Sequence, residues 1–182
     1  MNKVGSLGLL AVALAGSLLT AVRLEAEIVQ KCINRAAGFS LEFPGGWEIS
    51  ENPKDGVSLI AFRPPEKADE SVYERLEVAL RRDEGEGPDD FFQEHILCLR
   101  KNYPDFALIS EGSEKLSGLT SRFLVYAYTD TFFTLKVLAK AKQWMVWRDG
   151  RVYLITGTAT VASFPQWEEA FQKIAGSFHL LD

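Results

Sequence analysis

The dipeptide Asp149-Gly150 constrains the fold of this chain most, because it separates two long runs of strand-forming residues, 132–148 and 151–161. Asp-Gly strongly favours a two-residue type I′ loop, which joins neighbouring antiparallel strands. An isolated hairpin is only marginally stable in water. The sequence therefore predicts a β-hairpin that further strands and a closing helix must cover.

The first arm of this hairpin has two different faces, because side chains alternate along a strand. The face predicted to join the core consists of Phe133, Leu135, Val137, Ala139, Ala141, Met145 and Trp147. The opposite face consists of Thr134, Lys136, Lys140, Lys142, Trp144 and Arg148. We expect the hairpin to pack with its first face against the core.

Apolar patterning predicts further strands at 39–43, 47–49, 57–62, 72–82, 106–111 and 119–130. Turns rich in Gly, Pro and Asn separate the first three, which we expect to be successive antiparallel strands. The polar residues 112–118 are expected to connect two strands.

Two amphipathic helices are also predicted. The first covers residues 88–102, where apolar side chains repeat at helical spacing and Pro104 disfavours continuation. The second begins at Ser163, with Pro165 in its first turn and Gln166 at the position of a capping box. Its predicted buried stripe consists of Trp167, Phe171, Ile174 and Phe178.

Segment 119–130 carries apolar side chains on both of its faces, and a sheet of this kind usually has helices on both sides. A length of 182 residues with 47% hydrophobic residues suits one domain. We therefore expect an α+β domain at residues 38–182, with a mainly antiparallel twisted sheet and helices on both faces (an α/β/α sandwich). Residues 27–37 are expected to be a linker.

The N-terminus is predicted to be a signal peptide, residues 1–26. Lys3 precedes an uncharged run from Val4 to Val22, and small residues follow near Ala26. Cleavage after Ala26 is expected, with sites after Ala21 or Ala15 as alternatives. The apolar run is also close to the ~18 residues of a membrane helix, so an uncleaved signal anchor is a second alternative.

Cys32 and Cys98 are the two cysteines of the chain, and both remain after cleavage at Ala26. In an oxidising compartment they are candidates for a disulfide. The alternative is that Cys98 is a small apolar residue of a helix and Cys32 belongs to the linker.

The net charge of -5 excludes a nucleic-acid-binding protein of the usual basic kind. One stripe is nevertheless basic. Lys136, Lys140, Lys142, Trp144 and Arg148 share a strand face and form a candidate partner-binding face for an acidic protein or an anionic lipid surface. The alternative is that the lysine stems cover apolar sheet surface while Trp144 packs under a helix.

Signatures of catalysis and cofactor binding are missing: the chain has no G-x-S-x-G, H-E-x-x-H, Walker or C-x-x-C motif. His95 has too few neighbouring ligand residues for a metal site, and a half-buried structural histidine is expected. Asp89 and Asp90 are explained by their place at a helix N-terminus. We expect no catalytic residue, cofactor or metal.

Two segments resemble the PsbP-like and DcrB-like proteins. The first is Gly38-Phe39-Ser40-Leu41-Glu42-Phe43-Pro44-Gly45-Gly46-Trp47, and the second combines Asp149-Gly150-Arg151-Val152-Tyr153 with Trp167 and Ile174-Ala175-Gly176-Ser177-Phe178. The resemblance covers the chain from Gly38 onward. It implies an exported α/β/α sandwich with a non-enzymatic binding or assembly role.

The expected function is accordingly an exported, non-enzymatic binding or assembly factor that recognises a protein partner or envelope complex through its surface. It would be located in a periplasm, a thylakoid lumen or the extracellular space. It would contact a membrane only through the signal segment or peripherally. The alternatives are a small exported hydrolase with a dispersed active site and a stable subunit of an envelope complex.

Overall fold

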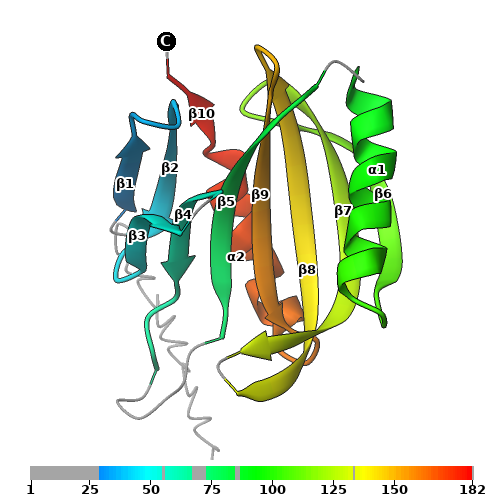
Figure 1. Ribbon diagram of the computed structural model, residues 1–182. Helices are drawn as coiled ribbons and strands as arrows, with labels where there is room; N and C mark the ends of the chain where they lie inside the picture. The colour runs from blue at the N-terminus through cyan, green and yellow to red at the C-terminus, as the bar shows by residue number, and fades with distance from the viewer. Residues whose placement is uncertain (1–28, 55, 67–72, 85–86, 133, 182) are drawn as a thin grey trace, which may run out of the picture.

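In the part of the chain that the structure describes, the fold consists of two antiparallel sheets and two helices (Figure 1). The computed structural model describes residues 29–54, 56–66, 73–84, 87–132 and 134–181. The predicted signal peptide and its candidate cleavage sites lie outside these residues. The elements are β1 (Val29–Asn34), β2 (Phe39–Pro44), β3 (Glu48–Lys54), β4 (Val57–Phe62), β5 (Arg75–Arg82), α1 (Gly87–Asn102), β6 (Ala107–Leu116), β7 (Leu119–Phe132), β8 (Leu135–Arg148), β9 (Arg151–Thr160), α2 (Phe164–Gly176) and β10 (His179–Leu180).

The predicted hairpin is formed by β8 and β9, which pair from Ala139↔Thr160 to Arg148↔Arg151. Asp149 and Gly150 both have positive φ angles, of 51° and 69°. Positive φ at both central residues is the geometry of a type I′ turn, so this prediction is confirmed. The hairpin lies inside a seven-stranded sheet with the order β3-β4-β5-β9-β8-β7-β6.

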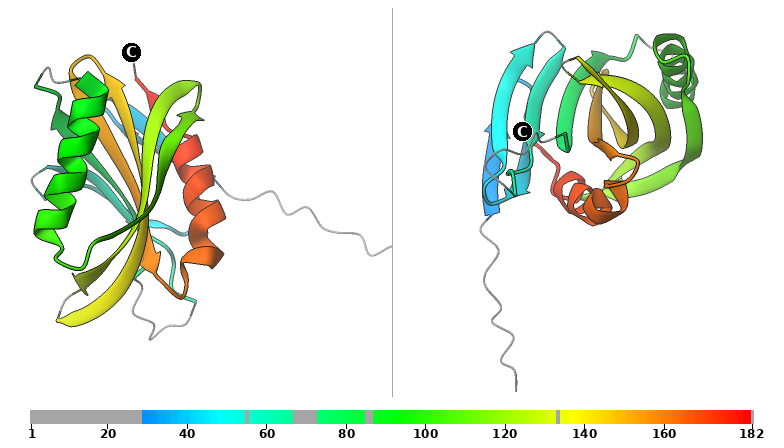
Figure 2. Two further views of the ribbon diagram at one scale, coloured as in Figure 1. Left: turned by 90° about the vertical axis from the view of Figure 1, so that its right-hand side faces the viewer. Right: turned by 90° about the horizontal axis from the view of Figure 1, so that it is seen from below.

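The two helices pack on opposite faces of this large sheet, as the left view of Figure 2 shows. On the α1 side, Ala139, Ala141 and Met145 lie in a core with Phe92 and Leu99. On the other side, Trp144 and Val146 lie in a second core, which α2 and the small sheet cover. The α+β class with helices on both faces is therefore confirmed. The hairpin, however, is buried on both faces rather than on one.

The first strands belong to different sheets, which corrects two predictions. Residues 29–34, within the expected linker, form β1 and pair with β2. A short β10 pairs with the other side of β2, giving a three-stranded sheet with the order β1-β2-β10. β2 therefore does not continue into β3 within one sheet, and the predicted run of successive strands is broken between Pro44 and Glu48.

Two strands are longer than predicted. β6 extends through the expected polar connection to Leu116, and a two-residue turn at Ser117-Gly118 leads into β7. β3 extends to Lys54, past an irregularity in its pairing with β4. Both are edge strands of the large sheet, and most of their side chains are exposed. Polar edge strands lack the apolar alternation that marks a half-buried strand.

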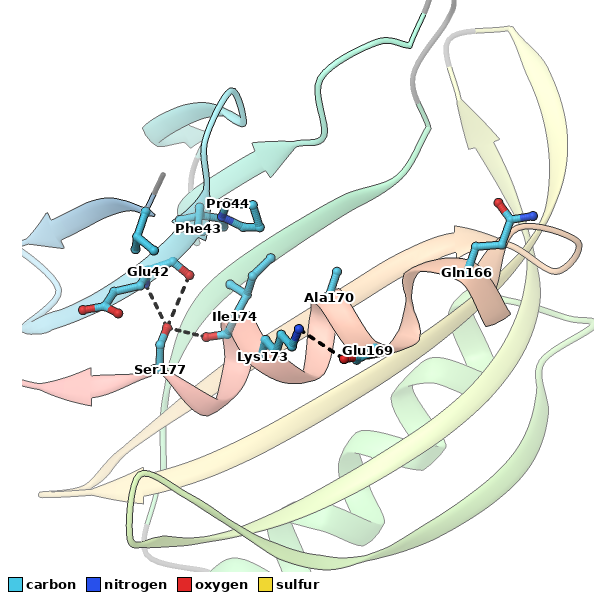
Figure 3. A pocket seen from close by; sticks show the side chains of 10 residues that line it. Glu42, Phe43, Pro44, Gln166, Glu169, Ala170, Lys173, Ile174 and Ser177 are labelled. Atoms are coloured by element: carbon cyan, nitrogen blue, oxygen red, sulfur yellow. Dashed lines mark hydrogen bonds and ion pairs between the residues drawn. The ribbon is translucent and has the colours of Figure 1, made fainter. Parts of the chain in front are cut away.

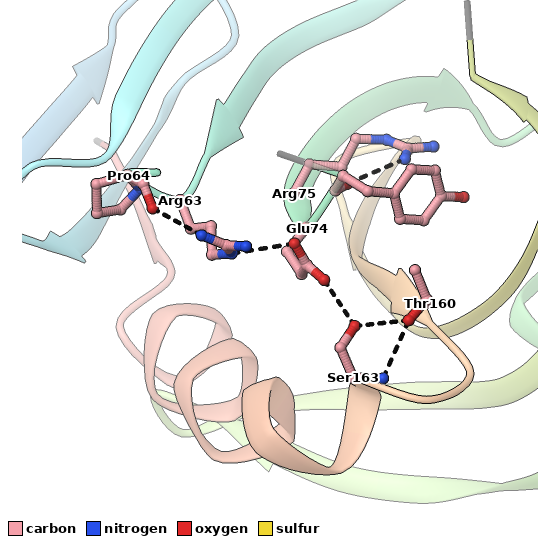
Figure 4. Close-up of polar contacts among 7 residues, drawn as sticks. Arg63, Pro64, Glu74, Arg75, Thr160 and Ser163 are labelled. Carbon is pink, nitrogen blue, oxygen red and sulfur yellow. Dashed lines mark hydrogen bonds and ion pairs between the residues drawn. The ribbon is translucent and has the colours of Figure 1, made fainter. Parts of the chain in front are cut away.

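The start of α2 is attached to the residue before β5 and the residue after β4 by a polar network (Figure 4). Ser163 occupies the N-cap position, but its side chain does not cap the helix. Instead its Oγ donates to Glu74 Oε1 at 2.6 Å, and Glu74 Oε2 accepts from Arg63 Nε at 3.0 Å. The predicted helix start is confirmed and the predicted capping box is not formed. This network, rather than a local cap, positions α2 against the sheet.

Neither of the helices among the described residues has the length and apolar character needed to cross a membrane.

Candidate functional site

A polar cleft lies between α1 and the large sheet; we call it the α1 cleft. In Figure 1 α1 lies beside β7 and β6, and β8, β9 and β5 follow in that order across the sheet. Its volume is about 370 Å³, within the range of about 300–1,000 Å³ that is usual for small-molecule sites. The lining residues are Lys54, Val57, Arg75, Glu77, Ala79, Arg81, His95, Cys98, Leu99, Asn102, Tyr103, Tyr126, Tyr128, Asp130, Gln143, Leu154, Thr156 and Thr158.

The depth of the cleft follows from the order of side-chain sizes across the sheet. Arg75 on β5 pairs with Thr158 on β9, Thr158 pairs with Ala141 on β8, and Ala141 pairs with Tyr126 on β7. Paired residues of neighbouring strands project from the same face. Two small side chains therefore lie between two large ones, and the floor is lowest over β9 and β8.

A hydrogen-bonded chain runs from α1 to the floor. His95 Nε2 lies 2.6 Å from Gln143 Oε1, and Gln143 Nε2 donates to Thr156 Oγ1 at 2.8 Å. Because the amide nitrogen of Gln143 is the donor to Thr156, its oxygen must accept the Nε2–H of His95. Burial lowers the pKa of His95, and the bond to Gln143 opposes that shift. The imidazole is thus a neutral, fixed donor at pH 7.

An ion pair spans one end of the cleft from β5 to β7. Arg75 Nη2 donates to Asp130 Oδ2 at 2.8 Å, and the hydroxyl of Tyr73 donates to the same oxygen at 2.8 Å. Burial alone would raise the pKa of Asp130, but these two donors lower it below its ordinary value. The Nε of Arg75 also lies 3.7 Å from Glu77 Oε2. The guanidinium is therefore balanced by two carboxylates.

The cleft contains several hydroxyl groups, and one of them is buried without a hydrogen-bond partner. Burial raises the pKa of Tyr103, Tyr126 and Tyr128, so their hydroxyls are neutral. The ring of Tyr128 packs 4.4 Å from that of Tyr103 and 5.5 Å from that of Tyr126. Thr158 is 1% exposed, and its Oγ1 has no hydrogen-bond partner. An unsatisfied buried polar group costs about 1–3 kcal/mol. A ligand atom that satisfies Thr158 would recover this cost.

The partners of the titratable groups in the cleft bear on the chemistry that it can support. His95 is oriented by an amide, and no described residue gives it a carboxylate or nucleophile as a hydrogen-bond partner. General-base and nucleophilic sites need such a pair. Among the described residues, no three His, Cys, Asp or Glu side chains are grouped to hold a metal ion. Asp89, at the start of α1, is paired with Arg122.

The predicted basic face is placed mostly under α2. Trp144 is fully buried, and its Nε1 donates to Glu114. Lys142 is paired with the same carboxylate at 3.3 Å, and the Nζ of Lys140 lies over the Phe164 ring at 4.5 Å. Lys136 and Arg148 are exposed, but they are twelve positions apart on one strand, which is roughly 40 Å. The five residues share a strand face without forming one exposed surface, because α2 covers its middle.

The two cysteines are free. Cys32 is buried in β1 among the residues that pack against the small sheet and α2, whereas Cys98 is exposed on α1. They lie on opposite sides of the large sheet, so the disulfide considered from the sequence is not formed. The second histidine, His179, is exposed on β10.

A second depression, the α2 groove, lies between β2 and α2 (Figure 3) and has a volume of about 320 Å³. Its polar groups bond to one another. Ser177 Oγ accepts from the backbone N–H of Glu42 at 2.8 Å and donates to the carbonyl of Ile174 at 2.6 Å. Lys173 pairs with Glu169 at 3.1 Å. The α1 cleft, which retains the buried, unpaired hydroxyl of Thr158, is the better candidate site.

Sequence reasoning singled out His95 and Cys98 on α1 but not the sheet residues that face them. Arg75, Tyr126, Asp130, Gln143 and Thr158 come from four strands, and no short motif joins them. A polar residue on an otherwise apolar strand face was the signal that could have indicated them. Gln143, between Ala141 and Met145, is an example.

Comparison with protein-family models finds no match, and comparison with curated proteins finds none either. Solved structures do match. Cyanobacterial PsbP (CyanoP) from Synechocystis sp. PCC 6803 is 16% identical with a TM-score of 0.59, covering 91% of this chain and 99% of its own. The Ran-binding protein Mog1p of Saccharomyces cerevisiae is 10% identical with a TM-score of 0.60, covering 86% and 97%. LpqN, involved in cell envelope biogenesis of Mycobacterium tuberculosis, is 12% identical with a TM-score of 0.59, covering 85% and 92%. Identities this low show a shared fold alone, and this chain has the PsbP-like fold.

Proposed function

We propose that this protein is an exported, non-enzymatic binding or assembly factor, and that the α1 cleft is its recognition site. The observation that carries the proposal is the buried, unpaired hydroxyl of Thr158 on the floor of a cleft that three tyrosines also line. A site built for binding presents polar groups whose partners come with the ligand. His95 and Asp130 are both held by partners that suit structure rather than proton transfer.

Structures of the same fold support a binding role. Mog1p is a Ran-binding protein, and LpqN is involved in cell envelope biogenesis. These roles belong to those proteins, and the step from them to this chain is our proposal. The export part of the proposal rests on the N-terminal pattern of residues 1–26.

Blocking the mouth of the cleft tests the binding role. Asn102 lines the cleft, and the neighbouring Lys101 lies outside the lining; both are exposed at the end of α1. Asn102→Trp should therefore obstruct the cleft, while Lys101→Trp adds the same bulk to the outer surface. Both variants should keep their free energy of unfolding within about 0.5 kcal/mol of the original chain. Tagged chains purified from the native host would be compared by mass spectrometry for bound molecules and proteins.

The expected result is that material bound by the original chain and by Lys101→Trp is lost from Asn102→Trp. Equal recovery from all three chains would show that recognition does not use the cleft. The intact mass of the same preparations tests export. A chain that begins after Ala26 is expected, and a retained Met1 would contradict the predicted cleavage.

A further inference from the structure

The arrangement of donors and acceptors in the α1 cleft narrows the chemistry of its ligand, provided that the cleft is the binding site proposed above. The Oγ1 of Thr158 lies between Arg75 and Tyr126 in the cross-strand row and is unpaired. Hydroxyls of tyrosine and threonine both donate and accept. The ligand should therefore also carry groups that donate and accept.

The charges around Arg75, beside the Thr158 end of the cross-strand row, disfavour an ionic ligand at that place. Arg75 lies 2.8 Å from Asp130 and 3.7 Å from Glu77. A carboxylate or phosphate placed beside Arg75 would also meet these two carboxylates, and like charges that are close together are unfavourable. An ammonium group would meet the guanidinium. The charges around Arg75 therefore compensate one another, which suits a neutral ligand there. Of the two other cations in the lining, Arg81 donates to the backbone carbonyls of Gly56 and Leu80, and Lys54 is exposed at the end of β3.

The lining also offers apolar contacts beside the polar groups. Ala79, Leu99 and Leu154 line the cleft together with the polar residues. A ligand that carries several hydroxyls on a compact carbon ring can contact both kinds of surface. The hydroxyls face the polar residues while the C–H groups pack on the apolar ones. The volume of about 370 Å³ accommodates one or two such rings.

We propose that the α1 cleft binds a neutral, polyhydroxylated ligand, a mono- or disaccharide, with the hydroxyl of Thr158 as a specificity-determining contact. Glu77 and Asp130 would accept hydrogen bonds from sugar hydroxyls, and the tyrosine and threonine hydroxyls would bond to the remaining ones. Free sugars and the terminal unit of a glycan share this chemistry.

Titration of the ¹⁵N-labelled protein, followed by amide chemical shifts, tests the proposal. The probes are glucose, mannose and trehalose as neutral sugars, acetate and inorganic phosphate as anions, and N-acetylglycinamide as a neutral amide. Maltotriose represents a ligand that binds through the terminal unit of a glycan. At least one sugar should shift the amides of Gln143, Thr156 and Thr158 and leave that of Ser177 in the α2 groove unchanged.

The variant Thr158→Val separates recognition from folding. It keeps the side-chain shape and removes a hydroxyl that has no partner in the protein. The denaturation midpoint should therefore stay the same or rise, while sugar affinity falls at least about tenfold. Thr131→Val, at an exposed position of β7, is the matched control and should bind as the original chain does.

Three outcomes would overturn the saccharide assignment: no sugar shifts the cleft amides, an anion or the amide shifts them more strongly than every sugar, or Thr158→Val binds sugar as well as the original chain. Acetate, phosphate or the amide could instead bind in the cleft, with Asn102→Trp abolishing that binding. This result would support the proposed recognition site and contradict only the assignment of a saccharide as its ligand. If Asn102→Trp also leaves the material bound in the host unchanged, the proposal that the α1 cleft is the recognition site is contradicted as well.

Discussion

Lys142 shows at the scale of one residue how position decides the role of a charge. Its Nζ lies 3.3 Å from Glu114 Oε2 and donates to Gln172 Oε1 at 2.8 Å. It also lies over the rings of Phe123 and Trp144. Only 12% of its side chain is exposed. Lys142 therefore connects β8 to β6 and α2 and does not offer its charge to a partner.

Charge reversal at two lysines of β8 tests this role. Lys142→Glu would place a second carboxylate beside Glu114 in a largely buried site, so the free energy of unfolding should fall by about 3 kcal/mol or more. Lys136→Glu, on the same strand face but exposed, should change it by no more than about 0.5 kcal/mol. Urea unfolding measures both values. Equal effects of the two substitutions would contradict the assigned role.

Single residues were predicted unevenly, for a physical reason. Strand alternation predicted that Lys136, Lys142 and Trp144 share a face, and they do. Whether that face is covered depends on α2, whose position is set by Ser163 and Glu74, 89 residues apart in the chain. Local patterning contains no information about such a contact.

Gly157 on β9 determines, at the scale of elements, how closely α2 approaches the sheet. A Cβ added at Gly157 would lie 2.6 Å from Cγ of Phe171, closer than atoms in contact can be. The absence of a side chain lets the fully buried Phe171 ring pack directly on the strand. The packing of Phe171 thus requires glycine at position 157, although glycine in the middle of a strand destabilises the strand.

Gly157→Ala should therefore lower the free energy of unfolding by about 1–3 kcal/mol, because Phe171 must move within a filled core. Gly176→Ala, at the end of α2, is the control. Nothing lies within 4 Å of its added Cβ, so it should be neutral or slightly stabilising. In a Phe171→Leu background the cost of Gly157→Ala should shrink, which a double-mutant cycle measures. If Gly157→Ala lowers the free energy of unfolding equally in both backgrounds, the added methyl group does not clash with Phe171.

Elements with a strong local signal were predicted well. The β8–β9 hairpin, α1 and α2 each combine a regular apolar period with a turn or proline signal. The strands β1 and β10 were missed, and β6 was predicted too short. β10 has two residues, and β6 exposes most of its side chains. Backbone pairing with distant partners, not apolar alternation, defines these strands.

Curvature of the large sheet brings distant strands together at the scale of the whole molecule. β5 and β7 are separated by β9 and β8 in the sheet order, yet Arg75 of β5 bonds to Asp130 of β7. Tyr73 packs edge-on against Phe132 at 5.1 Å beside this pair. The sheet therefore folds around the α1 cleft, and the ion pair closes one end of it.

The same ion pair makes the stability of the molecule depend on acid. Donors in the folded state hold the pKa of Asp130 below its ordinary value, despite burial. In the unfolded chain the pKa returns to about 3.9, so the unfolded state binds the proton more tightly. The stabilisation is complete above about pH 4 and is lost as the pH falls through the folded pKa.

Asp130→Asn should accordingly cost about 2 kcal/mol at pH 7 and less at pH 3, where the unfolded form of the original chain takes up a proton at Asp130. Urea unfolding of both chains at pH 7, 4 and 3 measures the difference. If the difference in free energy of unfolding between the two chains does not shrink on acidification, Asp130 is not the group that makes the stability depend on acid.

The cleft as a whole could not have been assembled from the sequence. Its central row joins Arg75, Thr158, Ala141 and Tyr126, and chain order gives no hint of that adjacency. The fold class was predictable because it depends on periodicity, which is local. The site depends on strand order and curvature, which are not.

The exposed thiol of Cys98 on α1 allows a probe to be attached beside the cleft. Cys98 lines the mouth of the cleft, whereas burial raises the pKa of Cys32 to about 11 and leaves that sulfur protonated and enclosed. Alkylating reagents attack the thiolate of accessible cysteines. A fluorescent maleimide would thus attach to the unaltered chain at one defined position, where its emission would report when the neighbouring space fills or empties.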